Sequence, residues 1–261
     1  MANGLIRGLI TKGTKPENIW ASDPDDSKLQ LLAQDCGIQT GKNTDIARSA
    51  SLIVLAVKPQ AMRDACKALA ADIGDRKVLL VSIAAGITTS HLESWFGEYA
   101  AIVRCMPNTP ALVGMGASGL FANAKVTKEQ KQLAQEVIST VGFATWVDAD
   151  SDIDIVTAIS GSGPAYFFLF MEAMQATAKE MGLSEDLARA LTYHTAAGAA
   201  TLAQYSEDDI ATLRRNVTSP GGTTEQAILQ FEDGGLRGLV AKALKAARTR
   251  SAELAEEIDR A

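Results

Sequence analysis

The segment from Ser219 to Glu225 carries the residue types best suited to holding a small anion. Its sequence, Ser-Pro-Gly-Gly-Thr-Thr-Glu, predicts a tight turn, because proline fixes φ and glycine allows positive φ. Thr223 and Thr224 then begin a predicted helix with an acid in its first turn. Such a turn aligns backbone N–H groups and hydroxyls toward a carboxylate or a phosphate. An ordinary loop with a capped helix fits these residues equally well.

The composition of the chain is that of an acidic globular protein. The 261 residues are 47% hydrophobic and 21% charged, with a net charge of −6. The hydrophobic fraction is high enough for a sizeable buried core. Because the net charge is negative, we do not expect a nucleic-acid-binding surface or a polybasic patch that binds membranes. The three cysteines and two histidines have no disulfide, metal or triad spacing, and no apolar run approaches a membrane span. We therefore expect a cytoplasmic protein without a metal, nucleic acid or membrane as partner.

Residues 1–149 alternate between apolar strands and helices. This pattern predicts an α/β fold with a doubly wound, parallel sheet covered on both faces. The predicted strands are Ile19–Ser22, Leu52–Val57, Val78–Ile83, Ala101–Met106 and Phe143–Val147. The predicted helices between them are Asp25–Asp35, Pro59–Ala71, Thr88–Phe96 and Lys128–Val141.

Residues 150–261 contain no strand pattern and predict an all-helical domain. The predicted helices are Ile153–Ser160, Pro164–Met181, Ser184–Tyr205, Glu207–Asn216, Thr223–Phe231 and Leu236–Ile258. The helix after Pro164 is apolar nearly all round its first turns, so it must be enclosed. A helical domain of this size offers little room to enclose it, and we therefore expect a second chain to help, as in a homo-oligomer.

Two glycine motifs are interpreted as decoys, and one expected motif is missing. A dinucleotide-binding sheet opens with a strand and a glycine loop, whereas Met1–Ile10 already has a helical pattern. The Gly-x-Gly-x-x-Gly match at Gly114–Gly119 follows prolines and precedes a strand-like pair instead of a helix. Ser160–Pro164 lacks the glycine two places before the serine that a nucleophile elbow requires.

Five motifs, in order along most of the chain, together resemble those of the pyrroline-5-carboxylate reductases, which complete proline synthesis. They are Ala56–Pro59, Ala84–Gly86, Arg104–Pro110, Ser160–Tyr166 and Val217–Thr224. The resemblance implies a Rossmann-type domain followed by a helical domain that forms a dimer, which some members assemble into decamers. It also implies hydride transfer from NADPH or NADH to the C=N carbon of 1-pyrroline-5-carboxylate, giving L-proline.

The start of the chain departs from this family. Relatives carry a strand and a Gly-x-Gly-Asn-Met-type loop before the residues that correspond to Met1–Asn3. Either the recorded start is an internal methionine of a longer chain, or the sheet lacks its first strand. The second alternative predicts poor cofactor affinity and an unstable α/β half.

The resemblance supplies the expected roles on the substrate side. The substrate-binding residues are Ser219, Gly221, Gly222, Thr223 and Glu207, and the catalytic residue is Thr224. The Thr224 hydroxyl would hydrogen-bond the ring nitrogen and help to deliver its proton. No strong acid of the protein is needed, because the cofactor performs the hydride transfer. Glu207 has a competing interpretation, a first-turn helix acid beside Ser206.

The expected cofactor-binding residues lie mostly after strands, where open sheets bind ligands. They are Asn43, Ala56, Val57, Lys58, Pro59, Ala84, Ala85 and Asn108. The same residues also fit purely structural roles. These are turns after the strands, a helix cap at Asn43 and a loop at Asn108. Asp23, at the end of the first strand, favours a ribose hydroxyl and hence NADH, but many relatives use NADPH and the strand register leaves the choice open.

Two other hypotheses remain compatible with the sequence. A reductase of another imino acid or of a β-hydroxy acid would keep the same fold. A catalytically weak oligomerisation partner would keep the helical domain and lack the cofactor loop.

Overall fold

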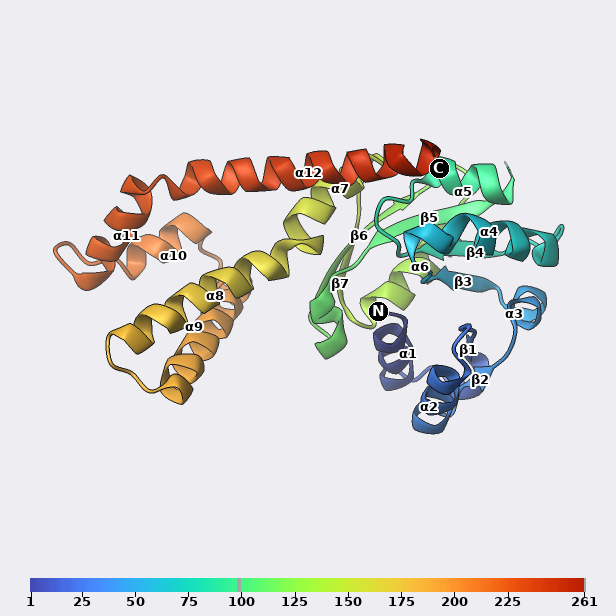
Figure 1. Cartoon of the computed structure of the whole chain (residues 1–261), viewed down its shortest axis with the longest axis horizontal. Coiled ribbons are helices and arrows are strands. Elements are labelled where there is room, and N and C mark those ends of the chain that lie inside the picture. Colours follow the sequence, from blue (N-terminus) through green and yellow to red (C-terminus); the bar gives the residue numbers. More distant parts are fainter. Residues whose placement is uncertain (98–99, 261) are drawn as a thin grey trace. The chain divides into compact units, whose positions relative to one another are not determined.

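The computed structural model describes residues 1–97 and 100–260 and divides into two compact units (Figure 1). The first unit contains Met1–Ser162 and Ala246–Ala261, and the second contains Gly163–Lys245. The first unit is therefore built from two segments of the chain, one before and one after the second unit in sequence. The expected domain boundary between residues 149 and 150 stays a prediction.

A five-stranded sheet forms the centre of the first unit. Its strands are β3 (Leu52–Leu55), β4 (Leu79–Ser82), β5 (Ala101–Met106), β6 (Gly116–Ala122) and β7 (Gly142–Trp146), in that spatial order. All neighbours are parallel except β5 and β6. The doubly wound fold class is confirmed. The all-parallel expectation was wrong at β6, because only the η2 turn (Thr109–Val113) separates β5 from β6, too little chain for a parallel crossover.

Helices cover both faces of this sheet, as the continuous apolar strands predict. Along β4, Leu80 packs in the cluster that contains residues of α4 (Pro59–Ile73) and α5 (Thr89–Phe96). Leu79 and Val81 pack in the other cluster, with residues of α1 (Ala2–Thr11) and α6 (Lys128–Ser139). Successive side chains of a strand point to opposite faces, so both faces of β4 need an apolar cover.

A separate two-stranded parallel sheet joins β1 (Trp20–Ala21) and β2 (Gln39–Thr40). α2 (Asp26–Cys36) connects them, capped by the Asp25 side chain and ended by Gly37 at φ 69°. In the described residues no ladder links this sheet to the larger one. β2 and the following α3 (Asn43–Ser49) were not predicted, because β2 has two residues and α3 only two turns.

The C-terminal end of α12 (Leu236–Arg260) belongs to the first unit. The Arg63 Nη2 donates to the Ile258 carbonyl at 2.9 Å, and His91 Nε2 lies 2.7 Å from Asp259 Oδ1. His91 Nδ1 also accepts the Thr88 N–H, so this histidine joins α5 to the end of α12. These contacts explain why the last turns of the chain group with the sheet.

The second unit is entirely helical, as expected. It contains α8 (Gly163–Glu180), α9 (Glu185–Tyr205), α10 (Ile210–Asn216), α11 (Thr223–Asp233) and the first part of α12. α10 begins at Ile210 and not at Glu207, because the Asp209 carboxylate accepts the Thr212 N–H at 2.7 Å and caps the helix there. The interpretation of Glu207 as a first-turn acid was therefore wrong.

One helical stretch, Asp152–Glu180, has the length and apolar composition of a membrane span, and 17% of its most apolar window is buried. It runs from α7 (Asp152–Val156) through the π-helical η3 (Thr157–Gly161) into α8. This differs from the expectation that no run approaches a span. The helix continues through the Ser160–Gly163 motif, which the sequence pattern interpreted as a break. An exposed apolar helix of this kind requires a cover, which a protein partner can provide.

Candidate active site

The Ser219–Gly222 segment forms the predicted turn. The Gly222 N–H donates to the Ser219 carbonyl at 2.9 Å, and Gly221 adopts φ 71°. Pro220 and a positive-φ glycine in these positions are the signature of a type II turn. α11 follows at once, with Gly222 as its N-cap, so no side chain caps the helix.

Hydrogen-bond donors are left available at this helix start. Among the described residues, no acceptor is recorded for the hydroxyls of Ser219, Thr223 and Thr224 or for the N–H groups of the two threonines. The Gly221 N–H is different, because it donates to Glu225 Oε2 at 2.7 Å. A carboxylate of the protein thus already uses one donor of the turn, and the remaining donors suit a second carboxylate.

Glu207 lies in the exposed link between α9 and α10. The neighbouring Asp208 N–H donates to Ser206 Oγ at 3.1 Å, whereas no hydrogen bond or ion pair of Glu207 is recorded in the described part of the chain. The side chain is therefore free to meet a ligand.

On the cofactor side, three predicted segments meet at one edge of the five-stranded sheet. Leu55 pairs with Ser82, and Ser82 pairs with Arg104, so β3, β4 and β5 run in parallel toward that edge. The segments that follow these strands contain Ala56–Pro59, Ala84–Ala85 and Asn108. Lys58 is the N-cap of α4 and Pro59 its first residue. Parallel sheets bind ligands at this edge.

Asn108 is buried, and both ends of its amide are engaged within the protein. Its Oδ1 accepts the Ala117 N–H at 2.9 Å, and its Nδ2 donates to the Ser160 carbonyl at 3.0 Å. Ser160 belongs to the π-helical η3, in which the Ser162 N–H donates to the Thr157 carbonyl at 2.8 Å. Asn108 therefore connects the end of β5 with β6 and with a helical irregularity of a kind frequent at functional sites.

Arg104 is the first residue of one of the five motifs, but no role was predicted for it. Its side chain is 3% exposed. Its Nη1 lies 3.0 Å from Asp150 Oδ1, and its Nη2 lies 3.4 Å from Asp154 Oδ1. Asp150 Oδ2 also accepts the N–H and hydroxyl of Thr89, and Asp154 Oδ1 accepts the Ser251 hydroxyl at 2.8 Å. A lone arginine inside the apolar strand Ala101–Met106 was the available signal. This network fixes the entry to α7 on β5.

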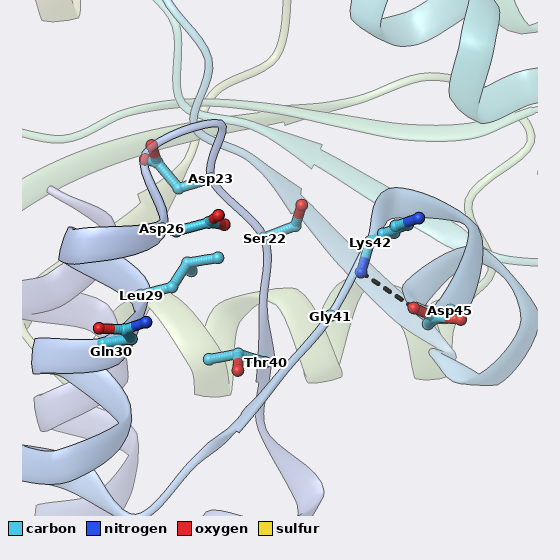
Figure 2. A pocket seen from close by; sticks show the side chains of 9 residues that line it. All are labelled: Ser22, Asp23, Asp26, Leu29, Gln30, Thr40, Gly41, Lys42 and Asp45. Carbon is cyan, nitrogen blue, oxygen red and sulfur yellow. Dashed lines mark hydrogen bonds between the residues drawn. The ribbon is translucent and has the colours of Figure 1, made fainter.

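A pocket of about 380 Å³ lies at the carboxyl ends of β1 and β2 (Figure 2). It is lined by Ser22, Asp23, Asp26, Leu29, Gln30, Thr40, Gly41, Lys42 and Asp45. Asn43, the first residue of α3, is next to Lys42 in the chain but does not line the pocket. The position after two parallel strands is the one expected for the adenosine ribose of a dinucleotide.

The two decoy motifs have packing roles. A Cβ on Gly119 would lie 2.6 Å from Val156 Cγ2, and one on Gly161 would lie 2.6 Å from Met106 Cε. Gly116 and Gly119 belong to β6 and not to a strand-to-helix loop. These glycines permit close approach between elements.

Two of the three cysteines, Cys66 and Cys105, are buried. Burial raises the pKa of the Cys66 and Cys105 thiols to about 12. Within residues 1–97 and 100–260, no group of three or more His, Cys, Asp or Glu side chains is arranged to hold a metal ion.

Comparisons with known proteins support the resemblance. A family model described as pyrroline-5-carboxylate reductase dimerisation matches residues 150–254, and one described as NADP oxidoreductase, coenzyme F420-dependent, matches residues 1–86. The chain is 49% identical to a pyrroline-5-carboxylate reductase of Pseudomonas aeruginosa, over 99% of the chain and 94% of that protein. The chain belongs to the pyrroline-5-carboxylate reductase family.

Solved structures of pyrroline-5-carboxylate reductases agree with this fold. The structure of the Coxiella burnetii protein has a TM-score of 0.93 and 44% identity, covering 97% of this chain and 94% of that one. A Plasmodium falciparum pyrroline carboxylate reductase, crystallised with NADP bound, has a TM-score of 0.85 and 29% identity, covering 97% and 93%. The α/β unit of this pyrroline-5-carboxylate reductase family member is thus of the NAD(P)-dependent type, and its helical part is of the dimerisation type.

Proposed function

We propose that this protein reduces 1-pyrroline-5-carboxylate to L-proline with NADPH or NADH. The observation that carries the proposal is the Ser219–Gly222 turn, whose following helix leaves threonine hydroxyls and N–H groups available. The substrate is a small cyclic imine with one carboxylate, and this turn offers the donors that a carboxylate needs. Identity of 49% to a protein of that name supports the same substrate.

On the substrate side, the turn and Glu207 share the binding of the imino acid. The residues proposed to hold it are Ser219, Gly221, Gly222, Thr223 and Glu207. Thr224 is the proposed catalytic residue, because its hydroxyl can donate to the ring nitrogen as the C=N bond is reduced. A neutral hydroxyl suffices because it can relay a proton from water to the nitrogen, while the hydride comes from the cofactor.

The residues on the cofactor side fit a nicotinamide dinucleotide. When bound, the cofactor supplies the hydride. Three strand ends meet at one sheet edge, and α1 begins without an acidic residue in its first turn, which suits a pyrophosphate. The residues proposed to form the cofactor side of the site are Asn43, Ala56, Val57, Lys58, Pro59, Ala84, Ala85 and Asn108. Asn108 acts through position, because its amide already bonds Ala117 and Ser160.

We further propose a cytoplasmic homodimer that assembles through residues 150–261, with a decamer as a higher assembly. Phe167, Phe168 and Leu169 are between 61% and 67% exposed, and the dimerisation model covers residues 150–254. A second copy would cover this apolar surface without a membrane. Sedimentation velocity should give at least twice the monomer mass, and a monomer at micromolar concentration would oppose this arrangement.

The direct experiment combines the purified chain, 1-pyrroline-5-carboxylate and each reduced cofactor. We expect cofactor oxidation that depends on the imino acid and yields L-proline in equal amount. If the protein turned over a hydroxy acid but not the imino acid, the proposed substrate would be wrong, and the protein would be a hydroxy-acid enzyme of the same fold. A folded oligomer that neither binds the cofactor nor reduces the imino acid would instead favour an oligomerisation partner.

A further inference from the structure

The pocket at the carboxyl ends of β1 and β2 has an acidic wall. Ser22 and Asp23 follow β1, Asp26 begins α2, and Lys42 and Asp45 flank the start of α3. Three of the lining residues are therefore aspartates, and one, Lys42, is a cation. Figure 2 shows Asp23 and Asp26 on the α2 side, with the Lys42 ammonium directed away from them.

These carboxylates retain free acceptor oxygens. Asp23 Oδ1 accepts the Asp25 N–H at 2.9 Å, and in the described structure its second oxygen has no recorded partner. The Asp26 side chain has no recorded hydrogen bond or ion pair there. Asp45 Oδ2 accepts the Lys42 N–H at 2.9 Å. The α2 side of the pocket can thus accept hydrogen bonds from hydroxyl groups.

An acidic pocket distinguishes two forms of the adenosine ribose. A free 2′-hydroxyl donates to a carboxylate, whereas a 2′-phosphate meets like charge. The nearest further cation on α2, Lys28, lies 3.4 Å from Asp25 and does not line the pocket. Lys42 alone opposes three carboxylates, so the pocket offers a phosphate no net electrostatic attraction.

We propose that Asp23 and Asp26 select NADH over NADPH in this protein. The proposal rests on the proposed function for the identity of the cofactor, and it adds the choice between the two forms. It assigns Asp23 as acceptor of the ribose hydroxyl and Asp26 as a second repulsive charge against a 2′-phosphate.

The test measures binding by calorimetry with ADP-ribose and 2′-phospho-ADP-ribose, which cannot be turned over. The full chain should bind ADP-ribose at least about tenfold more tightly, as like-charge repulsion predicts. In the double variant Asp23→Asn and Asp26→Asn this ratio should fall to about one. Raising the ionic strength should also narrow the ratio for the unmodified chain, because salt screens exposed charges.

Asp35→Asn is the matched control. It removes the same charge from the far end of α2, where Asp35 pairs with Arg7 at 2.9 Å outside the pocket. This variant should keep the ratio of the unmodified chain, and circular dichroism should verify that all variants are folded. Equal or tighter binding of the phosphorylated analogue, a ratio unchanged in the double variant, or no binding of either analogue would overturn the proposal.

The outcome is separate from that of the proposed function. Binding of the two analogues requires no substrate and no turnover. A chain that reduces the imino acid with NADPH preferred would overturn the selectivity alone. A chain that binds ADP-ribose selectively and never reduces the imino acid would overturn the proposed reaction alone.

Discussion

Asn108 Nδ2 donates a hydrogen bond to the Ser160 carbonyl at 3.0 Å, across 52 residues of sequence. The same amide accepts the Ala117 N–H, so one side chain fixes the loop after β5 against both β6 and η3. Asn108 therefore joins the cofactor-facing edge of the sheet to η3 within the first unit.

Replacing Asn108 by Ala should destabilise the protein by about 1–3 kcal/mol, because two part-buried backbone groups, the Ala117 N–H and the Ser160 carbonyl, lose their partner. Turnover should fall at temperatures where the variant is still folded, as the loop loses its position. Asn123→Ala is the matched control, because Asn123 bonds Ile102, Glu93 and Ala100 at the opposite edge of the sheet. Equal loss of turnover in both folded variants would contradict a positioning role for Asn108.

Replacing Thr224 by Ala should lower kcat by about a hundredfold, the usual effect of losing a group that assists proton transfer. Cofactor affinity, followed by fluorescence titration, should change little. Thr224→Ser keeps the hydroxyl and should recover most of the activity. If the alanine variant weakened cofactor binding and turnover equally, the assigned role would be wrong.

Replacing Glu225 by Ala should lower the KM for the imino acid severalfold. The change frees the Gly221 N–H from Glu225 Oε2 and removes a negative charge beside an anionic substrate. Gln226→Ala, one position along the same helix, should leave KM unchanged. A raised KM in the Glu225 variant would instead show that its carboxylate supports the turn.

Replacing Arg104 by Met should destabilise the first unit by on the order of 3 kcal/mol, because Asp150 and Asp154 lose their buried counter-charge. Urea unfolding gives the measurement. Arg250→Met removes an exposed arginine that pairs with Glu253 and Glu257, and should leave the unfolding midpoint nearly unchanged. If the two variants had similar urea unfolding midpoints, the proposed stabilising role of Arg104 would be wrong.

Thiol labelling at pH 8 should modify Cys36 and spare the other two cysteines in the folded protein. Burial raises the pKa of Cys66 and Cys105 to about 12, so the reactive thiolate forms are scarce well below that pH. Peptide mass spectrometry identifies the labelled positions, and labelling after unfolding in urea should reach all three. Rapid labelling of Cys105 in the native state would contradict its burial within the sheet.

The sequence predicted long apolar elements well and short ones poorly. β5 has the predicted bounds, because six apolar-rich residues lie between turn signals. β2 was missed because it is short. Of β6 only the strand-like pair Leu120-Phe121 was noticed, because the start of this strand is rich in glycine, which is needed for close packing against Val141 and Val156. Residues that approach from distant segments, such as Asp154 and Ser251, leave no local pattern.

The turn at Ser219–Gly222 was predictable because its chemistry is local. Proline, a positive-φ glycine and the helix start follow one another in sequence, and the structure has the Gly222-to-Ser219 hydrogen bond that this order implies. The contact from Glu225 back to Gly221 was not predicted, since a first-turn acid can as well point into solvent. The coupling of Asn108 to Ser160 depends on tertiary packing and also escaped prediction.

The most direct measurement uses cofactor deuterated at the transferable position of the nicotinamide, with 1-pyrroline-5-carboxylate and the purified chain. We expect L-proline that carries one deuterium on the former C=N carbon, detected by mass spectrometry and NMR. Absence of labelled proline, in a preparation verified to be folded and to bind the cofactor, would contradict the proposed reaction.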